Sequence, residues 1–313
     1  MENGGIGMQS RLLEAQAWEK YYKMGIESLD KQHVKLFTMA RKIVQIHDDE
    51  MRAPSANSFI GAEGIKFLKS YVIEHFTAEE AYMKKIGCSA YAEHKLEHDK
   101  FRKLVVKLEQ RLEESNYSEE SIQKLIGSVL AWLVNHIARV DMAIVGNAVP
   151  RPRKRAETES VGETIKDVMS NMFSVAFCGE KPMLINTDYR GEDFGKAVYY
   201  EQSYDSLETK QKVTILTAVE QRMVFYLGSS LLDSRVSEMS GLLYALIEEF
   251  GSLIMKNLDA VLIPEEHARN YVQNKFLTAE EFEERLKERK PEFSMLFETR
   301  VGHFAILINR RSF

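Results

Sequence analysis

The stretch HKLEH, residues 94–98, decides the fold of the first half of this chain. On an α-helix, residues four apart lie about 40° apart around the axis and one turn apart along it, so their side chains can meet. His94 and His98 therefore offer two imidazole nitrogens to one metal ion. The stretch predicts a helix with a metal site on one of its faces.

Three further stretches extend this pattern. In HFTAE, residues 75–79, a histidine and a glutamate stand four apart, and LDKQH, residues 29–33, ends in another histidine. In HIARVD, residues 136–141, the histidine and the aspartate are five apart, about 140° around an ideal helix. That pair requires a local distortion of the helix or an ion seated across its face. The predicted metal ligands are His33, His75, Glu79, His94, His98, His136 and Asp141.

Apolar residues at three- to four-residue spacing surround these stretches and predict four helices between about residues 28 and 146. The short connections favour an up-and-down four-helix bundle. A lone histidine in such a bundle is more often an ordinary core residue than a ligand. Five imidazoles and two carboxylates buried together without a metal, however, would carry a large desolvation cost. Nitrogen donors with a minority of carboxylates suit iron, manganese or zinc.

The stretch NAVPRPRKRAETES, residues 147–160, separates the two halves. Its two prolines interrupt any helix, and its four basic side chains repel one another. A basic run can also bind nucleic acid, but we favour a linker. The predicted division is a helical bundle over 1–146, a linker over 147–159 and a second domain over 160–313.

The second domain mixes helices and strands. An amphipathic helix is predicted near residues 165–173, and the stretches KAVYYEQ, KVTILTAVE and RMVFYLG have strand-like composition. A long helix is predicted over about 235–261, a short helix capped by Thr278 and Glu281 follows, and a hairpin turns near Gly302. Without regular alternation of strand and helix, the predicted class is α+β.

Composition excludes several classes of function. The net charge of −5 and the pI of about 6.0 argue against binding to nucleic acid or to an anionic membrane surface. Two distant cysteines do not form a disulfide framework. Neither an export signal nor an apolar run of about 18 residues is apparent. We therefore expect a cytoplasmic protein that does not enter a membrane.

The first half resembles the bacterial hemerythrins over about residues 18–143. The matching stretches are WEKYYKMGIESLDKQH, HFTAEE, HKLEHDKF and WLVNHIARVD. The resemblance implies a centre of two non-haem iron ions with O₂ as the ligand. One iron then takes three histidines, the other takes two and keeps a position open for O₂, and two carboxylates bridge them. The resemblance implies that the three histidines of the first iron are His94, His98 and His136. The two histidines of the second iron are then His33 and His75, and the bridging carboxylates are Glu79 and Asp141.

The second half is similar to the CheX and CheC chemotaxis phosphatases over about residues 160–313. In ALIEEFGSLIMKN, residues 245–257, Glu249 stands at the acidic position of that family's E-x-x-N helix. The resemblance implies a response regulator as partner, with Glu249 and residue 252 in catalytic positions. This chain departs from the pattern because residue 252 is serine. A hydroxyl is shorter than an amide and cannot present a donor and an acceptor in one plane, which puts phosphatase activity in doubt. The alternative is that Glu248 and Glu249 form a solvated helix face.

Three hypotheses follow from these observations. The leading one is a cytoplasmic sensor of O₂ or redox state whose second domain signals to a chemotaxis or two-component partner. The second is a protein that stores or delivers O₂, with the second domain joining two copies into a homodimer. The third is an enzyme, either a phosphatase using Glu249 or a di-iron oxidase or peroxidase.

Overall fold

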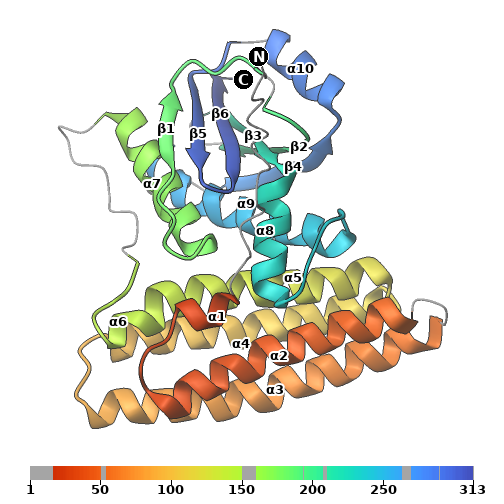
Figure 1. The fold of residues 1–313 in the computed structure, drawn as a ribbon, viewed down its shortest axis with the longest axis vertical. Coiled ribbons are helices and arrows are strands. Elements are labelled where there is room, and N and C mark those ends of the chain that lie inside the picture. The colour runs from red at the N-terminus through yellow and green to blue at the C-terminus, as the bar shows by residue number, and fades with distance from the viewer. Residues whose placement is uncertain are drawn as a thin grey trace, which may run out of the picture.

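The computed structural model describes residues 17–50, 54–149, 160–192, 194–206, 210–262, 269–288 and 290–312. It has an all-helical N-terminal domain and a C-terminal domain of sheet and helices, so the predicted fold classes are confirmed (Figure 1). Residues 150–159 of the predicted linker lie outside the described residues.

The N-terminal domain is a bundle of four long helices. The last of them changes its winding after His136 and continues as a π-helix, η1. Ser118 caps this last helix by accepting a hydrogen bond from the Ser121 amide at 3.3 Å. The elements are α1 (Trp18–Tyr21), α2 (Glu27–Glu50), α3 (Pro54–Lys85), α4 (Tyr91–Glu114), α5 (Glu119–His136), η1 (Ile137–Asp141) and α6 (Met142–Ile144).

The C-terminal domain is built on a six-stranded sheet of order β1-β5-β6-β3-β2-β4, with every pair of neighbours antiparallel. The predicted terminal hairpin is β5–β6, and the predicted capping box joins Thr278 to Glu281 by two hydrogen bonds. The elements are α7 (Val161–Ala176), β1 (Met183–Asn186), β2 (Ala197–Ser206), β3 (Gln211–Glu220), α8 (Gln221–Leu232), α9 (Gly241–Leu262), β4 (Arg269–Leu277), α10 (Ala279–Glu288), β5 (Phe293–Thr299) and β6 (Gly302–Ser312).

One predicted strand was wrong. The stretch RMVFYLG lies in helix α8. Its composition suggested a strand, but Met223, Val224, Leu227 and Leu231 are buried at spacings that place them on one helical face. The burial of one helical face, which depends on the whole fold, therefore favours a helix here despite the strand-like composition.

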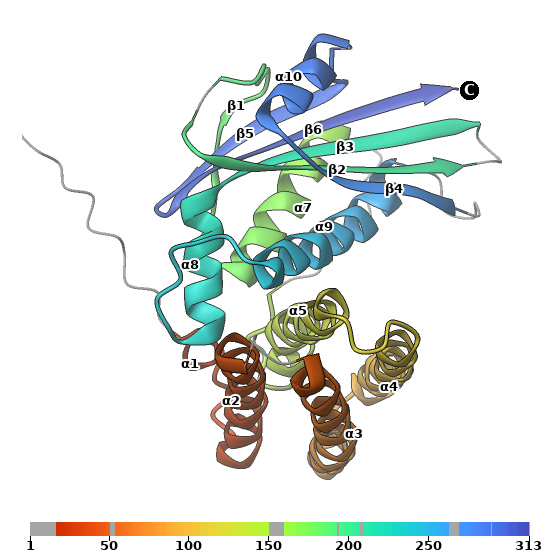
Figure 2. The ribbon, with the colours of Figure 1, turned by 90° about the vertical axis from the view of Figure 1, so that its right-hand side faces the viewer.

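Helices α7, α8 and α9 lie between the bundle and one face of the sheet, while α10 covers the other face (Figure 2). Helix α5 packs along α9, and α2 contacts α8. The N-terminal segment also joins the two domains: the buried Trp18 indole donates a hydrogen bond to the Val175 carbonyl of α7 at 3.1 Å. The two domains therefore share one hydrophobic core.

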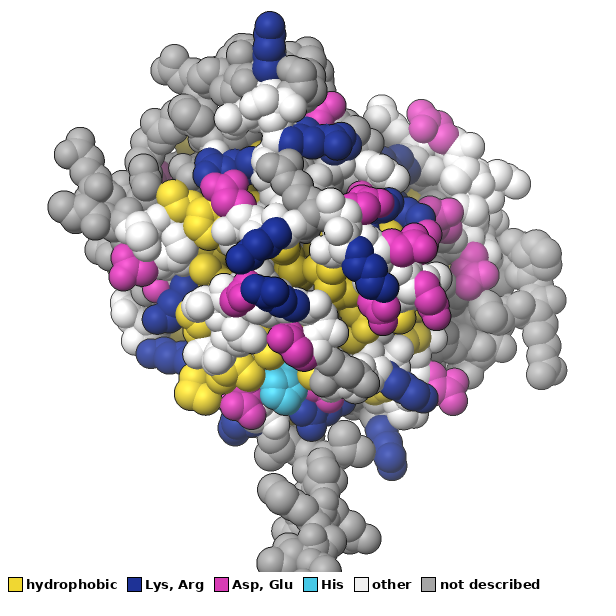
Figure 3. All heavy atoms as spheres, turned by 90° about the horizontal axis from the view of Figure 1, so that it is seen from above, with side chains coloured by type: hydrophobic (Ala, Val, Ile, Leu, Met, Phe, Trp, Pro, Cys, Tyr) yellow, Lys and Arg dark blue, Asp and Glu magenta, His cyan; other side chains and the backbone are white. Residues whose placement is uncertain are grey.

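Two surface features bear on function. By length and composition the helix Glu119–Ile144 could cross a membrane, but 89% of its apolar window is buried, as in the core helix of a bundle. On the face seen from the α10 end, acidic and basic side chains are interspersed around apolar ones (Figure 3). No basic region gathers among the residues coloured there.

Candidate metal centre

The structure brings all seven predicted ligands together inside the bundle, and none is more than 3% exposed. Helix α2 contributes one of them, α3 two, α4 two, α5 one and η1 one. Their donor atoms form two groups, each with all atoms within 4.8 Å of one another. One group is Glu79, His94, His98 and His136, and the other is His33, His75, Glu79 and Asp141.

The two carboxylates lie between the two groups. Glu79 belongs to both, and its Oε2 lies 3.1 Å from the Nε2 of His94. Asp141 directs its oxygens in two directions: Oδ2 lies 3.2 Å from the Nε2 of His33, and Oδ1 lies 2.9 Å from the Nε2 of His136. Each carboxylate can therefore supply oxygen to both groups, as bridging ligands do.

The π-helix explains how His136 and Asp141, five residues apart, can face the same metal position. A π-helix closes its turns at i+5, so residues five apart stack on one face as residues four apart do on an α-helix. Segment Ile137–Asp141 is that distortion. It turns the Asp141 carboxylate back toward the His136 imidazole, at 2.9 Å.

Two second-sphere side chains that sequence reasoning missed fix the histidine rings. The Nδ1 of His75 lies 2.9 Å from the amide oxygen of Gln32, and the Nδ1 of His98 lies 3.0 Å from a carboxylate oxygen of Glu80. Such partners select the tautomer that leaves Nε2 free for a metal. Gln32 precedes one ligand and Glu80 follows another in the sequence, a signal that could have identified both.

Aromatic rings line the centre. The Phe76 ring stacks on His98 with centroids 3.6 Å apart, and the Trp132 ring stacks on His136 at 4.2 Å. Tyr71 stacks on His75. These rings keep water from the imidazoles and limit their rotation.

The protonation of the cluster follows from burial and charge. Burial lowers the pKa of His75 to about 4 and also lowers the pKa of His136. Burial and the Asp141 charge both favour a neutral Glu79, yet the adjacent His94 and His98 outweigh them and lower its pKa to about 2. Burial opposes protonation of His33, but the Asp141 carboxylate raises its pKa above the ordinary value.

The donor set fits a transition metal. Among the described residues, several buried atoms of the cluster lack a hydrogen-bond partner of good geometry, including His33 Nε2, Glu79 Oε1 and both oxygens of Asp141. Buried polar atoms without partners are costly. The residues that carry these atoms all belong to the two groups. A cation between them would satisfy each one.

The predicted catalytic residues on α9 have different hydrogen-bond partners. The Ser252 hydroxyl is exposed and donates to the Glu248 carbonyl of its own helix at 2.9 Å. The Glu249 carboxylate instead accepts a hydrogen bond from the Ser128 hydroxyl of α5 at 2.7 Å. Glu249 therefore belongs to the contact between the domains, and Ser252 does not share its partner.

A four-helix bundle that gathers five histidines and two carboxylates in its interior defines a non-haem metal protein, and the donor set suggests iron. Residues 24–147 match the hemerythrin HHE cation-binding domain, and the chain belongs to the hemerythrin family through this domain. The bacteriohemerythrin of Clostridium acetobutylicum is 32% identical over 125 residues, which cover 40% of this chain and 94% of that protein. The bacteriohemerythrin of Methylococcus capsulatus is 37% identical over 112 residues, covering 36% and 79%.

Solved structures similar to the C-terminal half are chemotaxis proteins. CheX of Desulfovibrio desulfuricans covers 48% of this chain and 99% of its own, with 10% identity and a TM-score of 0.36. CheX in the CheX–CheY complex of Borrelia burgdorferi covers 49% and 99%, with 14% identity and a TM-score of 0.39. At these scores the likeness says nothing about what the C-terminal domain of this chain does.

Proposed function

We propose that the bundle holds two non-haem iron ions and binds O₂ reversibly. The observation that carries this proposal is the pair of ligand groups that share Glu79. With Glu79 and Asp141 both bridging, the first metal position would have three histidines and the second two, so the second would have one protein ligand fewer and a position left for O₂. Bound iron would supply the redox chemistry that reversible O₂ binding needs.

The protein's own residues would hold and shield that centre. Glu79 and Asp141 bring two negative charges between the metal positions and offset part of the ions' charge. Gln32 and Glu80 hold two imidazoles in orientation from behind. The rings of Phe76 and Trp132 keep the surroundings apolar, which favours binding of an apolar gas over entry of water.

We further propose that the protein is a cytoplasmic sensor and that the C-terminal domain carries the signal to a response regulator or another chemotaxis protein. Storage of O₂ needs no second domain, whereas sensing needs an output. One helix supports this reading: α5 bears the ligand His136 and packs along α9, the helix that bears Glu249.

Metal analysis with optical spectra tests the first part of the proposal. The purified protein, expressed with ample iron, is recorded in the reduced form and again after exposure to air. Two irons per chain and an absorption band that appears with O₂ and disappears on its removal are expected. A colourless, iron-free protein contradicts the proposal, and rapid turnover of peroxide favours the oxidase or peroxidase alternative.

Partner capture tests the second part. The iron-loaded protein, in reduced and O₂-exposed forms, is presented to phosphorylated response regulators. A sensor must bind its partner with different affinity in the two forms, because a ligand shifts only an equilibrium whose states it distinguishes. Equal affinity in both forms, together with rapid O₂ exchange and a stable homodimer, favours the storage alternative.

A further inference from the structure

Helices α5 and α9 cross at a point where only a small residue fits. A Cβ added to Gly127 would lie 3.0 Å from the Cβ of Ala245 and 3.2 Å from its carbonyl carbon. Real Cβ atoms rarely approach that closely. Gly127 therefore sets the separation of the two helices, and any larger residue would push α9 away from the bundle.

Polar contacts fix the two helices beside that crossing. Ser128 Oγ donates to Glu249 Oε1 at 2.7 Å, and Lys124 Nζ lies 3.5 Å from Glu248 Oε2. Ser128 is only 5% exposed, so its hydroxyl donates to the Glu249 carboxylate with little competition from water. Both adjacent glutamates of α9 are thus held by α5, about two to three turns before the ligand His136.

A second contact begins at the π-helix itself. Arg139, between the ligands His136 and Asp141, is 6% exposed and donates to the sulfur of Met172 in α7 at 3.3 Å. The Asn257 amide of α9 lies 3.4 Å from the same sulfur. The segment that positions the Asp141 carboxylate is therefore in contact with α7, and through Met172 with α9.

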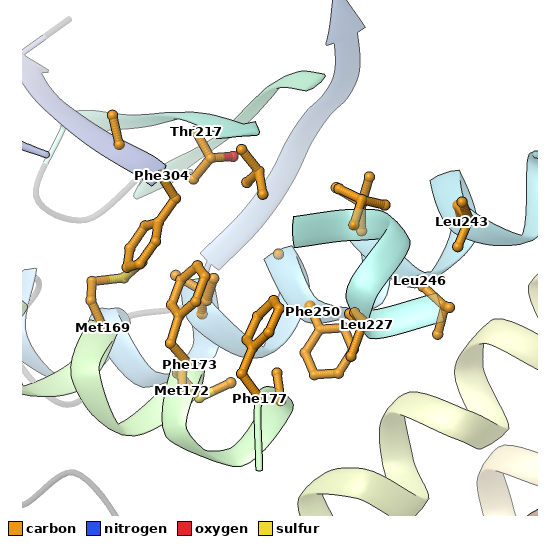
Figure 4. A pocket seen from close by; sticks show the side chains of 17 residues that line it. Met169, Met172, Phe173, Phe177, Thr217, Leu227, Leu243, Leu246, Phe250 and Phe304 are labelled. Atoms are coloured by element: carbon orange, nitrogen blue, oxygen red, sulfur yellow. The ribbon is translucent and has the colours of Figure 1, made fainter. Parts of the chain in front are cut away.

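The inner side of α9 has room to move. A cavity of about 70 Å³ lies between α7, α8, α9 and the sheet, and Leu243, Leu246 and Phe250 of α9 line it (Figure 4). The Met172 side chain lines the same cavity. A well-packed interior resists displacement, whereas a void beside a helix permits a small shift without overpacking.

We propose that the α5–α9 crossing couples the metal centre to the C-terminal domain, and that the bundle holds the Glu248–Glu249 face of α9 in one of two positions. This inference rests on the proposed function and names its regulation. A change at the centre alters η1 and α5, and the contacts at Gly127, Ser128 and Lys124 transmit it to α9. In this structure α5 partly covers Glu249.

Hydrogen exchange tests the coupling without any mutation. Amide exchange in α9 is measured in the iron-free, reduced and oxidised forms of the full chain. Coupling predicts that the amides of Gly241–Leu262 exchange at least about five-fold faster or slower between two of these forms, the lower end of typical allosteric coupling. Identical exchange of α9 in all three forms contradicts it.

Reciprocity gives the second test. If the centre biases the crossing, a change at the crossing must alter ligand affinity at the centre by the same factor. Azide, a small anion that binds open metal positions, is titrated into the iron-loaded protein. Gly127→Ala is expected to change the azide dissociation constant about five-fold or more, and adding Ala245→Gly is expected to reverse at least half of that change.

Matched controls separate the possible outcomes. Gly64→Ala makes the same change in α3, where the nearest atom is the flexible end of Ile43, and is expected to leave azide affinity unchanged. If Gly127→Ala does not fold, Ser128→Ala removes the hydrogen bond without adding volume. A wild-type protein without iron refutes the proposed function. A wild type that binds iron and azide, with crossing variants of unchanged affinity, refutes only the coupling.

Discussion

The bundle and the C-terminal domain each contain acidic residues that the sequence singled out, and the two sets are arranged differently. In the bundle, Glu79 and Asp141 are fully buried and face imidazole nitrogens from several helices. On α9, Ser252 bonds to its own helix and Glu249 bonds to the other domain. Convergence of side chains from separate elements, and not spacing along one helix, distinguishes a built site from a contact surface.

Supporting side chains make the same distinction. Each side of the histidine cluster has a residue behind it, Gln32 on one side and Glu80 on the other, together with stacked aromatic rings. The Glu249 carboxylate instead accepts a hydrogen bond from Ser128 of the other domain. The following experiments would break or sharpen this contrast.

The largest effect is expected from removing a ligand. His98→Ala should weaken iron binding about a thousand-fold, because even changes behind a ligand cost ten- to a hundred-fold. Competition with a chelator measures the affinity. His303→Ala removes a histidine of the C-terminal domain and should leave iron binding as it is. Two tightly held irons in His98→Ala would mean that the cluster is not the ligand set.

Acid should destabilise the iron-free protein. The pKa of His75 is lowered to about 4 in the folded chain and is about 6.5 when unfolded, so below pH 6.5 the unfolded form binds more protons. His33 and His94 have raised pKa values in the folded chain. The stability that they contribute is therefore almost fully present below pH 6.5 and changes little as the pH falls further. From pH 6.5 to 4.5 the free energy of unfolding should fall by about 2 kcal/mol.

Urea titration at several pH values measures that slope. His75→Gln cannot titrate and should make it shallower, leaving the part that His136 contributes, while His303→Ala serves as a control. An equally steep slope in His75→Gln would assign the acid sensitivity to another group.

A smaller effect is expected from changing Glu80, which lies behind the ligand His98. Glu80→Gln keeps an acceptor near His98 but removes its charge, so this side of the cluster comes to match the Gln32 side. Iron affinity should fall about ten-fold, the low end for such changes. Glu109→Gln is the control, since Glu109 pairs with Lys69 at the surface. Equal affinity in both variants would show that Glu80 does not support the metal.

The smallest effect is expected on α9. Ser252→Ala loses only an exposed hydrogen bond within its own helix and should change stability by less than about 0.5 kcal/mol. It should also leave the dephosphorylation of a response regulator unchanged. A clear loss of dephosphorylation would support the phosphatase hypothesis and place Ser252 in a catalytic role.

The sequence predicted most strongly where local spacing carries the information. Ligand pairs four apart, the Thr278–Glu281 cap and the turn near Gly302 are all set by neighbours in the chain. The stretch RMVFYLG was misassigned because its β-branched and aromatic residues fit a strand or a buried helix equally well. The short strand β1 and the edge strand β4 were missed because each gains its identity from a distant partner strand.

The candidate site shows the same limit. The seven inward-facing residues could be named from spacing, and the five-residue interval between His136 and Asp141 required either a distorted helix or an ion across its face. The contact of Ser128 with Glu249 spans 121 positions and involves two ordinary residue types, so no local pattern predicts it. It depends on how one domain docks onto the other.

The π-helix has a consequence for comparing this protein with its relatives. A π-turn is equivalent to one extra residue inserted into an α-helix. Deleting Ala138 would restore an ordinary helical interval between the histidine and the aspartate, and the residues after it would keep their faces, because the five-residue π interval and a four-residue α interval both cover slightly more than one turn. A relative whose helix is α-helical throughout would therefore align with this chain only with a one-residue gap inside Ile137–Asp141.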